Sequence, residues 1–221
     1  MYIGIYIYAR TLSKVNIKIN KVSITVKFSD LFRENGVKVI PVNEYFDTQV
    51  DDQVIAASTL HGKYIKQYYS GIESIRTLDD EINLKLKGIK YMENENRVMG
   101  KTKKFPIGTA IEVKNKYILT AFTKFDDRNK AYLNADDYVL FLHRFWDEID
   151  RLNNGRIVNV PLIGTGQSRI IPTFSEQDYL EQLIYSIKTS SIASTRCKIN
   201  IIIHESMKDE ISIFKLKNIF R

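Results

Sequence analysis

A glycine-rich loop in the last third of the chain contains the residues whose types and spacing best suit phosphate chemistry. An apolar run ends at Ile163 and continues directly into Gly164, Thr165, Gly166, Gln167, Ser168 and Arg169. Two glycines beside a hydroxyl residue allow consecutive backbone N–H groups to turn toward one point, and such a concave set of donors binds anions. Arg169 and Lys63 can add positive charge. The pattern therefore predicts a phosphate or diphosphate site.

A second group of polar residues follows the apolar run Val39–Val42. It consists of Asn43, Glu44, Tyr45, Phe46, Asp47 and Thr48, and a further polar stretch contains Ser58, Leu60, His61 and Gly62. Two polar loops that each follow a strand predict a nucleotide-like ligand. Other roles remain open, because Tyr45 and Phe46 also suit core packing, and His61 also suits a helix cap or a core position.

Length and composition describe an ordinary globular protein. The chain has 221 residues, of which 44% are hydrophobic and 27% charged, so one large domain can bury its own core. The single cysteine, Cys197, excludes an internal disulfide and a multi-thiolate metal site, and is expected to be a buried structural thiol. A reducing, cytoplasmic environment fits this cysteine usage. No metal and no resident cofactor are expected.

The charge balance is mildly basic. A formal net charge of +7 and a pI near 9.3 favour anionic partners such as phosphates, nucleic acid or a membrane surface. The lysines are scattered among acidic residues, and no stripe of basic and aromatic residues resembles a known nucleic-acid reader. We therefore expect no nucleic-acid partner, although a basic nucleic-acid-binding module stays as an alternative.

The first residues form a short apolar run, Met1–Tyr8. A bilayer-spanning helix needs about 20 apolar residues, so this run is too short to cross a membrane. It also lacks the basic start and the cleavage site of a signal peptide. We expect residues 1–14 to be an arm or the remnant of a linker to a membrane segment, and residues 15–221 to form the single domain.

The elements that must position these loops follow from hydrophobic periodicity. Expected strands are Val15–Ile19, Ile24–Phe28, Val37–Val42, Ile107–Val113, Tyr117–Phe122, Ile157–Ile163 and Ile199–Ile203, of which the first two form a hairpin. Expected helices are Asp51–Tyr69, Ala135–Leu152, one that begins at Ser175 with Asp178 as its capping partner, and Lys208–Phe220. The segment Asp79–Lys104 is expected to be an irregular or hairpin insertion.

This alternation of strands and helices predicts a layered α/β fold with a mixed sheet. Ligands of such sheets bind beyond the carboxyl ends of the strands. Because both polar loops follow strands, we expect them to meet there.

Several stretches resemble a macro domain, the ADP-ribose-binding module. They read VKFSDLF at 26–32, VIPVNEYFDTQVDD at 39–52 and STLHGKYI at 58–65, with GTGQSR at 164–169 in the place of the second phosphate loop. More narrowly, the chain is similar to the macro domain of membrane-anchored Thoeris anti-phage effectors over residues 15–220. The resemblance implies a three-layer α/β/α sandwich with a central mixed β-sheet.

The resemblance also implies roles for individual residues. Asp30, with the backbone of Leu31, would read adenine, and Asn43 would bind the distal ribose. His61 and Gly62 stand where the first phosphate loop begins, although the usual glycine triplet is missing. His204 would stack on the adenine. The alternatives are a turn or cap carboxylate for Asp30 and a surface position for His204.

The function implied by the resemblance is sensing. The ligand would be an ADP-ribose-derived signal, preferably a histidine conjugate, which a partner TIR-domain enzyme makes from NAD. Tyr45, Phe46 and Asp47 would recognise the group attached to the distal ribose. Binding would trigger abortive infection through a membrane segment upstream of this chain, so that the full-length protein is anchored at the inner membrane.

Catalysis is not required for this role. The enzymatic alternative is an ADP-ribosyl hydrolase, for which Asp47 and His61 are the available groups, although no paired acid and base spacing supports it. Whether the domain forms a homo-oligomer is left open.

Overall fold

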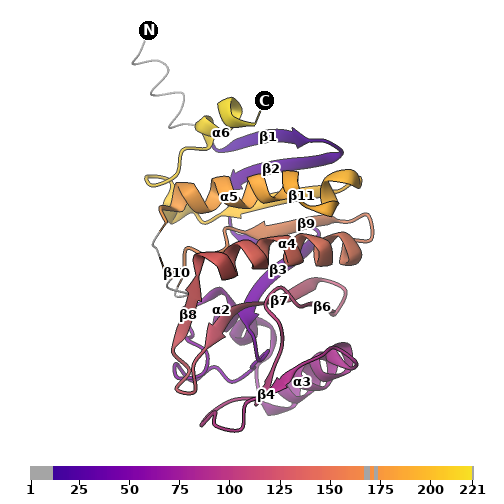
Figure 1. Cartoon of the computed structure of the whole chain (residues 1–221), viewed down its shortest axis with the longest axis vertical. Helices are drawn as coiled ribbons and strands as arrows, with labels where there is room; N and C mark the ends of the chain where they lie inside the picture. The colour runs from indigo at the N-terminus through magenta and orange to yellow at the C-terminus, as the bar shows by residue number, and fades with distance from the viewer. Residues whose placement is uncertain (1–11, 167–169, 172–173, 221) are drawn as a thin grey trace.

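The described part of the computed structural model comprises residues 12–166, 170–171 and 174–220 (Figure 1). Its centre is a nine-stranded sheet with the order β1-β2-β11-β9-β3-β7-β8-β10, in which β6 pairs with β7. The strands are β1 Lys14–Ile19, β2 Val22–Phe28, β3 Val37–Asn43, β6 Ala110–Val113, β7 Tyr117–Phe125, β8 Ala131–Asn134, β9 Ile157–Pro161, β10 Ile170–Ile171 and β11 Lys198–Ile203. The expected features at Met1–Tyr8 and at Gln167, Ser168 and Arg169 lie outside the described residues.

The sheet is mixed, as expected. The pairs β2–β11, β11–β9, β9–β3, β3–β7 and β8–β10 are parallel, whereas β1–β2, β6–β7 and β7–β8 are antiparallel. The hairpin β1–β2 has the register Ile17↔Ile24, and β1 alternates exposed and buried residues along its length. That alternation is the pattern from which the strand was predicted.

Helices cover both faces of the sheet. The helices are α2 Leu60–Tyr68, α3 Ile72–Leu86, α4 Ala135–Leu152, α5 Glu176–Thr189 and α6 Ile213–Ile219, with 3-10 turns η1 Leu31–Arg33, η2 Ser191–Ser194 and η3 Glu205–Met207. Figure 1 shows α4 and α5 side by side over one face. Their residues Trp146 and Ile184 belong to one apolar core, and Tyr64 of α2 and Leu78 of α3 belong to a second. The expected α/β/α sandwich is therefore confirmed.

Two expected helix starts were wrong, and one helix was not expected. Helix α2 begins at Leu60 rather than at Asp51, because the Asp51 and Asp52 carboxylates accept hydrogen bonds from nearby backbone N–H groups and hold residues 51–57 in turns. Helix α3 occupies the start of the expected irregular insertion, which also contains a short hairpin, β4 Met92–Glu93 with β5 Lys103–Lys104. Helix α6 begins only at Ile213, after η3.

Strands β3 and β9 part from each other near the middle of the sheet. They pair only at Val37↔Val158 and Lys38↔Asn159. Farther along, β3 contains Pro41 and β9 ends at Pro161, and proline has no N–H with which to continue a ladder. Each strand stays paired on its other side, β3 with β7 and β9 with β11. The sheet therefore opens between β3 and β9.

None of the helices in the described ranges is long and apolar enough to span a bilayer.

Candidate functional site

Two hollows lie at the carboxyl ends of the central strands. The first, with a volume of about 830 Å³, is enclosed by the ends of β3, β7 and β9, the start of α2 and the β7–β8 turn. The second, of about 620 Å³, lies between η1, α2 and the end of β11. They share Leu60, Pro161, Leu162, Thr165, His204 and Met207. We therefore describe them as one continuous cleft.

The glycine loop lines the first hollow, and its shape depends on Gly164. This residue has φ = 110°, and a Cβ placed on it would lie 2.6 Å from the Tyr179 ring. The Tyr138 hydroxyl donates a 3.0 Å hydrogen bond to the Ile163 carbonyl, which fixes the start of the loop. Gly166 is different, since a Cβ there would meet nothing within 4 Å. Gly164, Thr165 and Gly166 all line the hollow.

The amino terminus of α2 faces the same hollow. Thr59 caps the helix by accepting a 3.0 Å hydrogen bond from the Gly62 N–H, while Ser58, Leu60 and His61 line the hollow. A helix amino terminus carries partial positive charge and attracts anions. Gly62 lines neither hollow. It is needed for packing, because a Cβ there would lie 2.3 Å from the Ala56 carbonyl oxygen.

His61 is a buried, neutral histidine. Burial, with a smaller effect of the Lys101 cation, lowers its pKa to about 3, and a hydrogen bond with the Asp47 backbone acts in the opposite direction. Near pH 7 its imidazole therefore offers no positive charge to a phosphate.

Of residues 43–48, only Asn43 at the end of β3 lines the cleft. Asn43 lines the first hollow, whereas Tyr45, Phe46 and Asp47 are each 1% exposed, Thr48 is 5% exposed, and none of these four lines either hollow. The Asn43 Oδ1 atom accepts hydrogen bonds from the Tyr45 and Asp47 N–H groups, which folds the chain back into the protein. The structure therefore places these four side chains in the protein interior and not in the cleft, although all four were expected among the ligand-binding residues.

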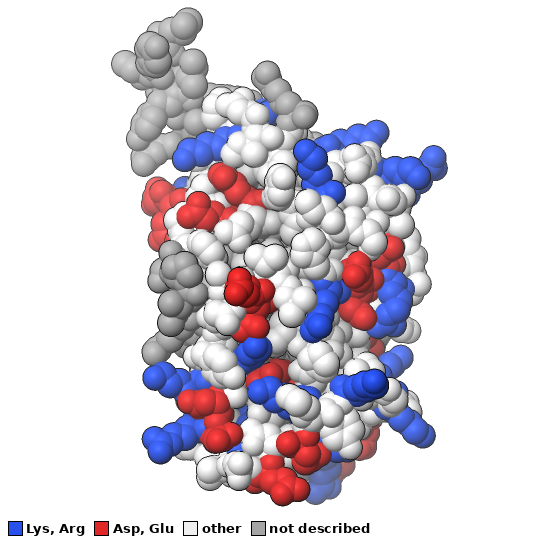
Figure 2. Space-filling model, viewed as in Figure 1, with Lys and Arg blue, Asp and Glu red and all other residues white. Residues whose placement is uncertain are grey.

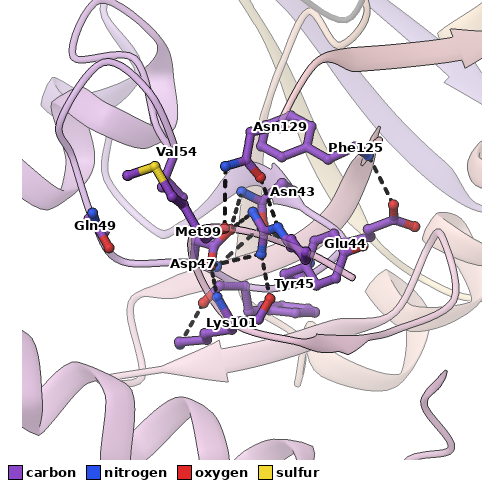
Figure 3. Close-up of polar contacts among 12 residues, drawn as sticks. Asn43, Glu44, Tyr45, Asp47, Gln49, Val54, Met99, Lys101, Phe125 and Asn129 are labelled. Carbon is purple, nitrogen blue, oxygen red and sulfur yellow. Dashed lines mark hydrogen bonds and ion pairs between the residues drawn. The ribbon is translucent and has the colours of Figure 1, made fainter. Parts of the chain in front are cut away.

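Asp47 instead forms a buried ion pair with Arg97. Its Oδ2 atom lies 2.6 Å from Arg97 Nη2, and both side chains are at most 1% exposed. Arg97 Nε also donates a 2.8 Å hydrogen bond to Asn129 Oδ1. Figure 3 shows Asn43, Asp47 and Asn129 gathered in this network.

Three residues of this region were not predicted from the sequence. Asn129 and Lys130, in the β7–β8 turn, line the first hollow, and Arg97 lies behind it. Asp47 and Arg97 are 50 positions apart in the chain, and no local pattern connects them.

The expected adenine-binding residues lie at the second hollow. Asp30 and Leu31 line it, and the Asp30 carboxylate accepts a 2.9 Å hydrogen bond from the Phe32 N–H, so that it also caps η1. His204 lines both hollows and is exposed. Its Nδ1 atom accepts a 3.3 Å hydrogen bond from the Ser206 N–H, which orients the ring. Among the residues that the structure describes, no group of three or more His, Cys, Asp or Glu residues is placed to hold a metal ion.

This fold with a cleft at the parting strands is that of a macro domain. The Oceanobacillus iheyensis macrodomain with ADP has a TM-score of 0.59 and 13% identity, and covers 94% of this chain and 96% of its own. A mutant of the same protein with ADPR has a TM-score of 0.61 and 14% identity, over 94% and 98%.

Sequence comparison defines the family more narrowly. Residues 24–204 match the family described as "Thoeris protein ThsA, Macro domain". Thoeris protein ThsA of Bacillus amyloliquefaciens (strain Y2) is 33% identical over 212 residues, which cover 93% of this chain and 70% of that protein. The chain therefore belongs to the Thoeris ThsA macro-domain family.

Proposed function

We propose that this domain senses an ADP-ribose-derived nucleotide in a Thoeris anti-phage system. The observation that carries the proposal is the continuity of the cleft. It runs from Asp30 and Leu31, past the loop Gly164–Gly166 and the start of α2, to Asn43. A ligand with adenine at one end, a diphosphate in the middle and a ribose at the other end matches this order of groups. The solved macrodomains with ADP and with ADPR support the same class of ligand.

The diphosphate is assigned to the glycine loop and the amino terminus of α2. These two features line the first hollow together, and both can bind anions through backbone N–H groups. Neutral donors bind a diphosphate without burying an extra cation, so they leave the binding energy only weakly dependent on salt. His61 contributes shape rather than charge.

The proposed signal is a histidine conjugate of ADP-ribose made from NAD by a partner TIR-domain enzyme. In this proposal, binding activates an effector that is anchored at the inner membrane through a segment outside this chain and causes abortive infection. The family of Thoeris protein ThsA supports a role in phage defence. The conjugate and the TIR partner are expectations from the resemblance described above.

We further propose that the domain binds without catalysis. The two groups available for hydrolysis are poorly suited to it. The Asp47 carboxylate is buried and accepts hydrogen bonds from Arg97, Asn43 and the Lys101 N–H, so it has little capacity left to activate water. His61 would act as a base, but its lowered pKa makes it a weak one.

Calorimetry with the purified domain tests the proposal. ADP-ribose, its histidine conjugate, cyclic ADP-ribose isomers and ADP should be titrated in parallel. We expect ADP-ribose and the conjugate to bind, with the conjugate tighter. Binding to none of them would contradict the sensor function. Catalytic release of ADP-ribose from a mono-ADP-ribosylated protein during long incubation would instead favour the hydrolase.

A test of membrane association requires the full-length protein. We expect it to sediment with the inner membrane when expressed in bacteria, and this domain to remain accessible to protease from the cytoplasmic side. Recovery of the full-length protein entirely in the soluble fraction would contradict this part of the proposal.

A further inference from the structure

Two asparagines that line the first hollow are held from behind by one buried ion pair. Asn43 ends β3, and Asn129 lies in the β7–β8 turn. The Asn43 Nδ2 group donates a 2.9 Å hydrogen bond to Asp47 Oδ2, and Asn129 Oδ1 accepts a 2.8 Å hydrogen bond from Arg97 Nε. With the Asp47–Arg97 pair between them, the two amides belong to one chain of hydrogen bonds.

The contacts of the ion pair fix the orientation of the Arg97 guanidinium. Arg97 donates to both Asp47 oxygens, at 3.2 Å and 2.6 Å, and its guanidinium carbon lies 3.8 Å from the centroid of the Tyr45 ring. A guanidinium is planar and its donors point in fixed directions, so its orientation also sets that of Asn129. A lysine at this position would keep the charge but could not make both sets of contacts.

The loop that carries Arg97, residues 94–102, is hydrogen-bonded both to the turn after β3 and to the β7–β8 turn. The Lys101 Nζ group donates a 2.7 Å hydrogen bond to the Phe46 carbonyl, and Asn94 Nδ2 donates a 2.9 Å hydrogen bond to the Tyr45 hydroxyl. From the β7–β8 turn, Asn129 Nδ2 donates a 3.2 Å hydrogen bond to the Met99 carbonyl. Figure 3 shows Met99 and Lys101 near Asp47, in the same network of polar contacts as Asn43 and Asn129.

Both asparagines lie at one end of the cleft. They line the first hollow only, whereas Asp30 and Leu31 line the second. A nucleotide whose adenine occupies the second hollow therefore brings its far end to Asn43 and Asn129. Each Nδ2 group carries a second hydrogen besides the one that it donates to Asp47 or to Met99, so each asparagine can still donate a hydrogen bond to a ribose hydroxyl group.

From this arrangement we infer that Asp47 and Arg97 are positioning residues for the distal ribose and its substituent. They act through Asn43 and Asn129, and the second of these is a further ligand-contacting residue. The inference rests on the proposed function. It assigns to the Asp47–Arg97 pair a selective role, because only ligands that extend beyond the diphosphate depend on the two amides.

Comparison of ADP-ribose with ADP tests this inference, since ADP lacks the distal ribose. Both ligands should be titrated into the wild type, Arg97→Lys and Asn129→Ala. Arg76→Lys is the matched control, because Arg76 is an exposed residue that pairs with Glu73 on α3. We expect Arg97→Lys and Asn129→Ala to weaken ADP-ribose binding about tenfold, the effect of about one well-placed hydrogen bond. ADP binding should stay within about twofold of the wild type.

A substitution that only disturbed the structure would weaken the binding of ADP-ribose and of ADP alike. Equal loss of ADP-ribose and ADP affinity, or no loss of either, would overturn the inference. If Arg97→Lys does not fold, Asn129→Ala decides the question, because it leaves the ion pair intact and should show the same selectivity. A wild type that binds ADP-ribose no better than ADP would contradict this inference alone, whereas a wild type that binds neither ligand would also contradict the proposed function.

Discussion

The two glycines of the phosphate loop differ in what they do. Gly164 is required by its backbone, because its φ of 110° and the nearby Tyr179 ring exclude a side chain. Gly166 has open space around the position of a Cβ and lines the cleft, so packing within the described structure does not require a glycine there. Replacement of the second glycine therefore separates binding from stability.

We expect Gly166→Val to abolish ADP-ribose binding and to change the free energy of unfolding by less than about 0.5 kcal/mol. The valine side chain would occupy the space of the diphosphate without touching the core. Calorimetry and urea denaturation check the two parts. Ser23→Val, on the exposed side of β2, adds the same side chain away from the cleft and should bind normally. Unchanged affinity of Gly166→Val would exclude the loop as the phosphate site.

His61 should make the stability of the domain depend on pH. Its pKa is about 3 in the folded protein, against an ordinary value of 6.5 for histidine. The unfolded chain therefore binds a proton that the folded protein does not. The contribution to stability is complete above pH 6.5 and decreases as the pH falls toward 3, by up to about 1.4 kcal/mol per pH unit.

Urea denaturation of the wild type and His61→Gln between pH 7 and pH 4 measures this contribution. As the pH falls, the wild type should lose stability relative to His61→Gln, because only the wild type has this histidine to protonate on unfolding. The carboxylates titrate equally in both proteins and cancel in the comparison. His143→Gln, at an exposed position on α4, is the matched control and should follow the wild type. Parallel curves for His61→Gln and the wild type would refute a neutral buried His61.

At the scale of elements, helix α5 shows which local signals can be predicted from sequence. The Ser175 and Asp178 side chains form the expected capping box, and each accepts a hydrogen bond from the other residue's backbone N–H. Such a cap depends only on residues three positions apart, so the sequence contains all the information that it needs. The start of α2 is different, because competing turns at Asp51 and Asp52 move it to Leu60.

Ser175→Ala should destabilise the domain by about 1 kcal/mol, because the Asp178 N–H at the start of α5 loses its acceptor. Ser212→Ala is the matched control, since Ser212 stands at the same position of α6 but makes no side-chain capping hydrogen bond. It should leave stability within about 0.5 kcal/mol of the wild type. Equal effects of the two substitutions in urea denaturation would show that the cap of α5 contributes nothing.

The cleft was only partly predictable for a related reason. Asn43, His61 and Gly164 follow strands or begin a helix, and local polarity was enough to place them at one end of the sheet. The direction in which Tyr45 and Phe46 point depends on how Asn43 folds the turn, and aromatic residues suit both a cleft wall and a core. Arg97 reaches the site through tertiary contacts, which one sequence does not reveal.

At the scale of the whole molecule, charge gives a test between ligand classes. The face shown in Figure 2 has Lys and Arg interspersed with Asp and Glu, although the net charge is +7. A protein that contacts six to ten phosphates of DNA loses about 10³ to 10⁵ in affinity between 50 and 200 mM salt. For ADP-ribose we expect less than about a tenfold loss over that range, measured by calorimetry. Tight, steeply salt-dependent binding of DNA or RNA would favour the nucleic-acid alternative.

The parting of β3 and β9 has a consequence for the rate of binding. Pro41 and Pro161 lack an N–H by their covalent structure, so this gap in the sheet requires no ladder hydrogen bonds to break when a ligand enters. In rapid-mixing experiments the observed rate constant of binding should therefore rise linearly with ADP-ribose concentration, as for a single encounter step. A rate that levels off would indicate a slow opening of the sheet before or after the encounter.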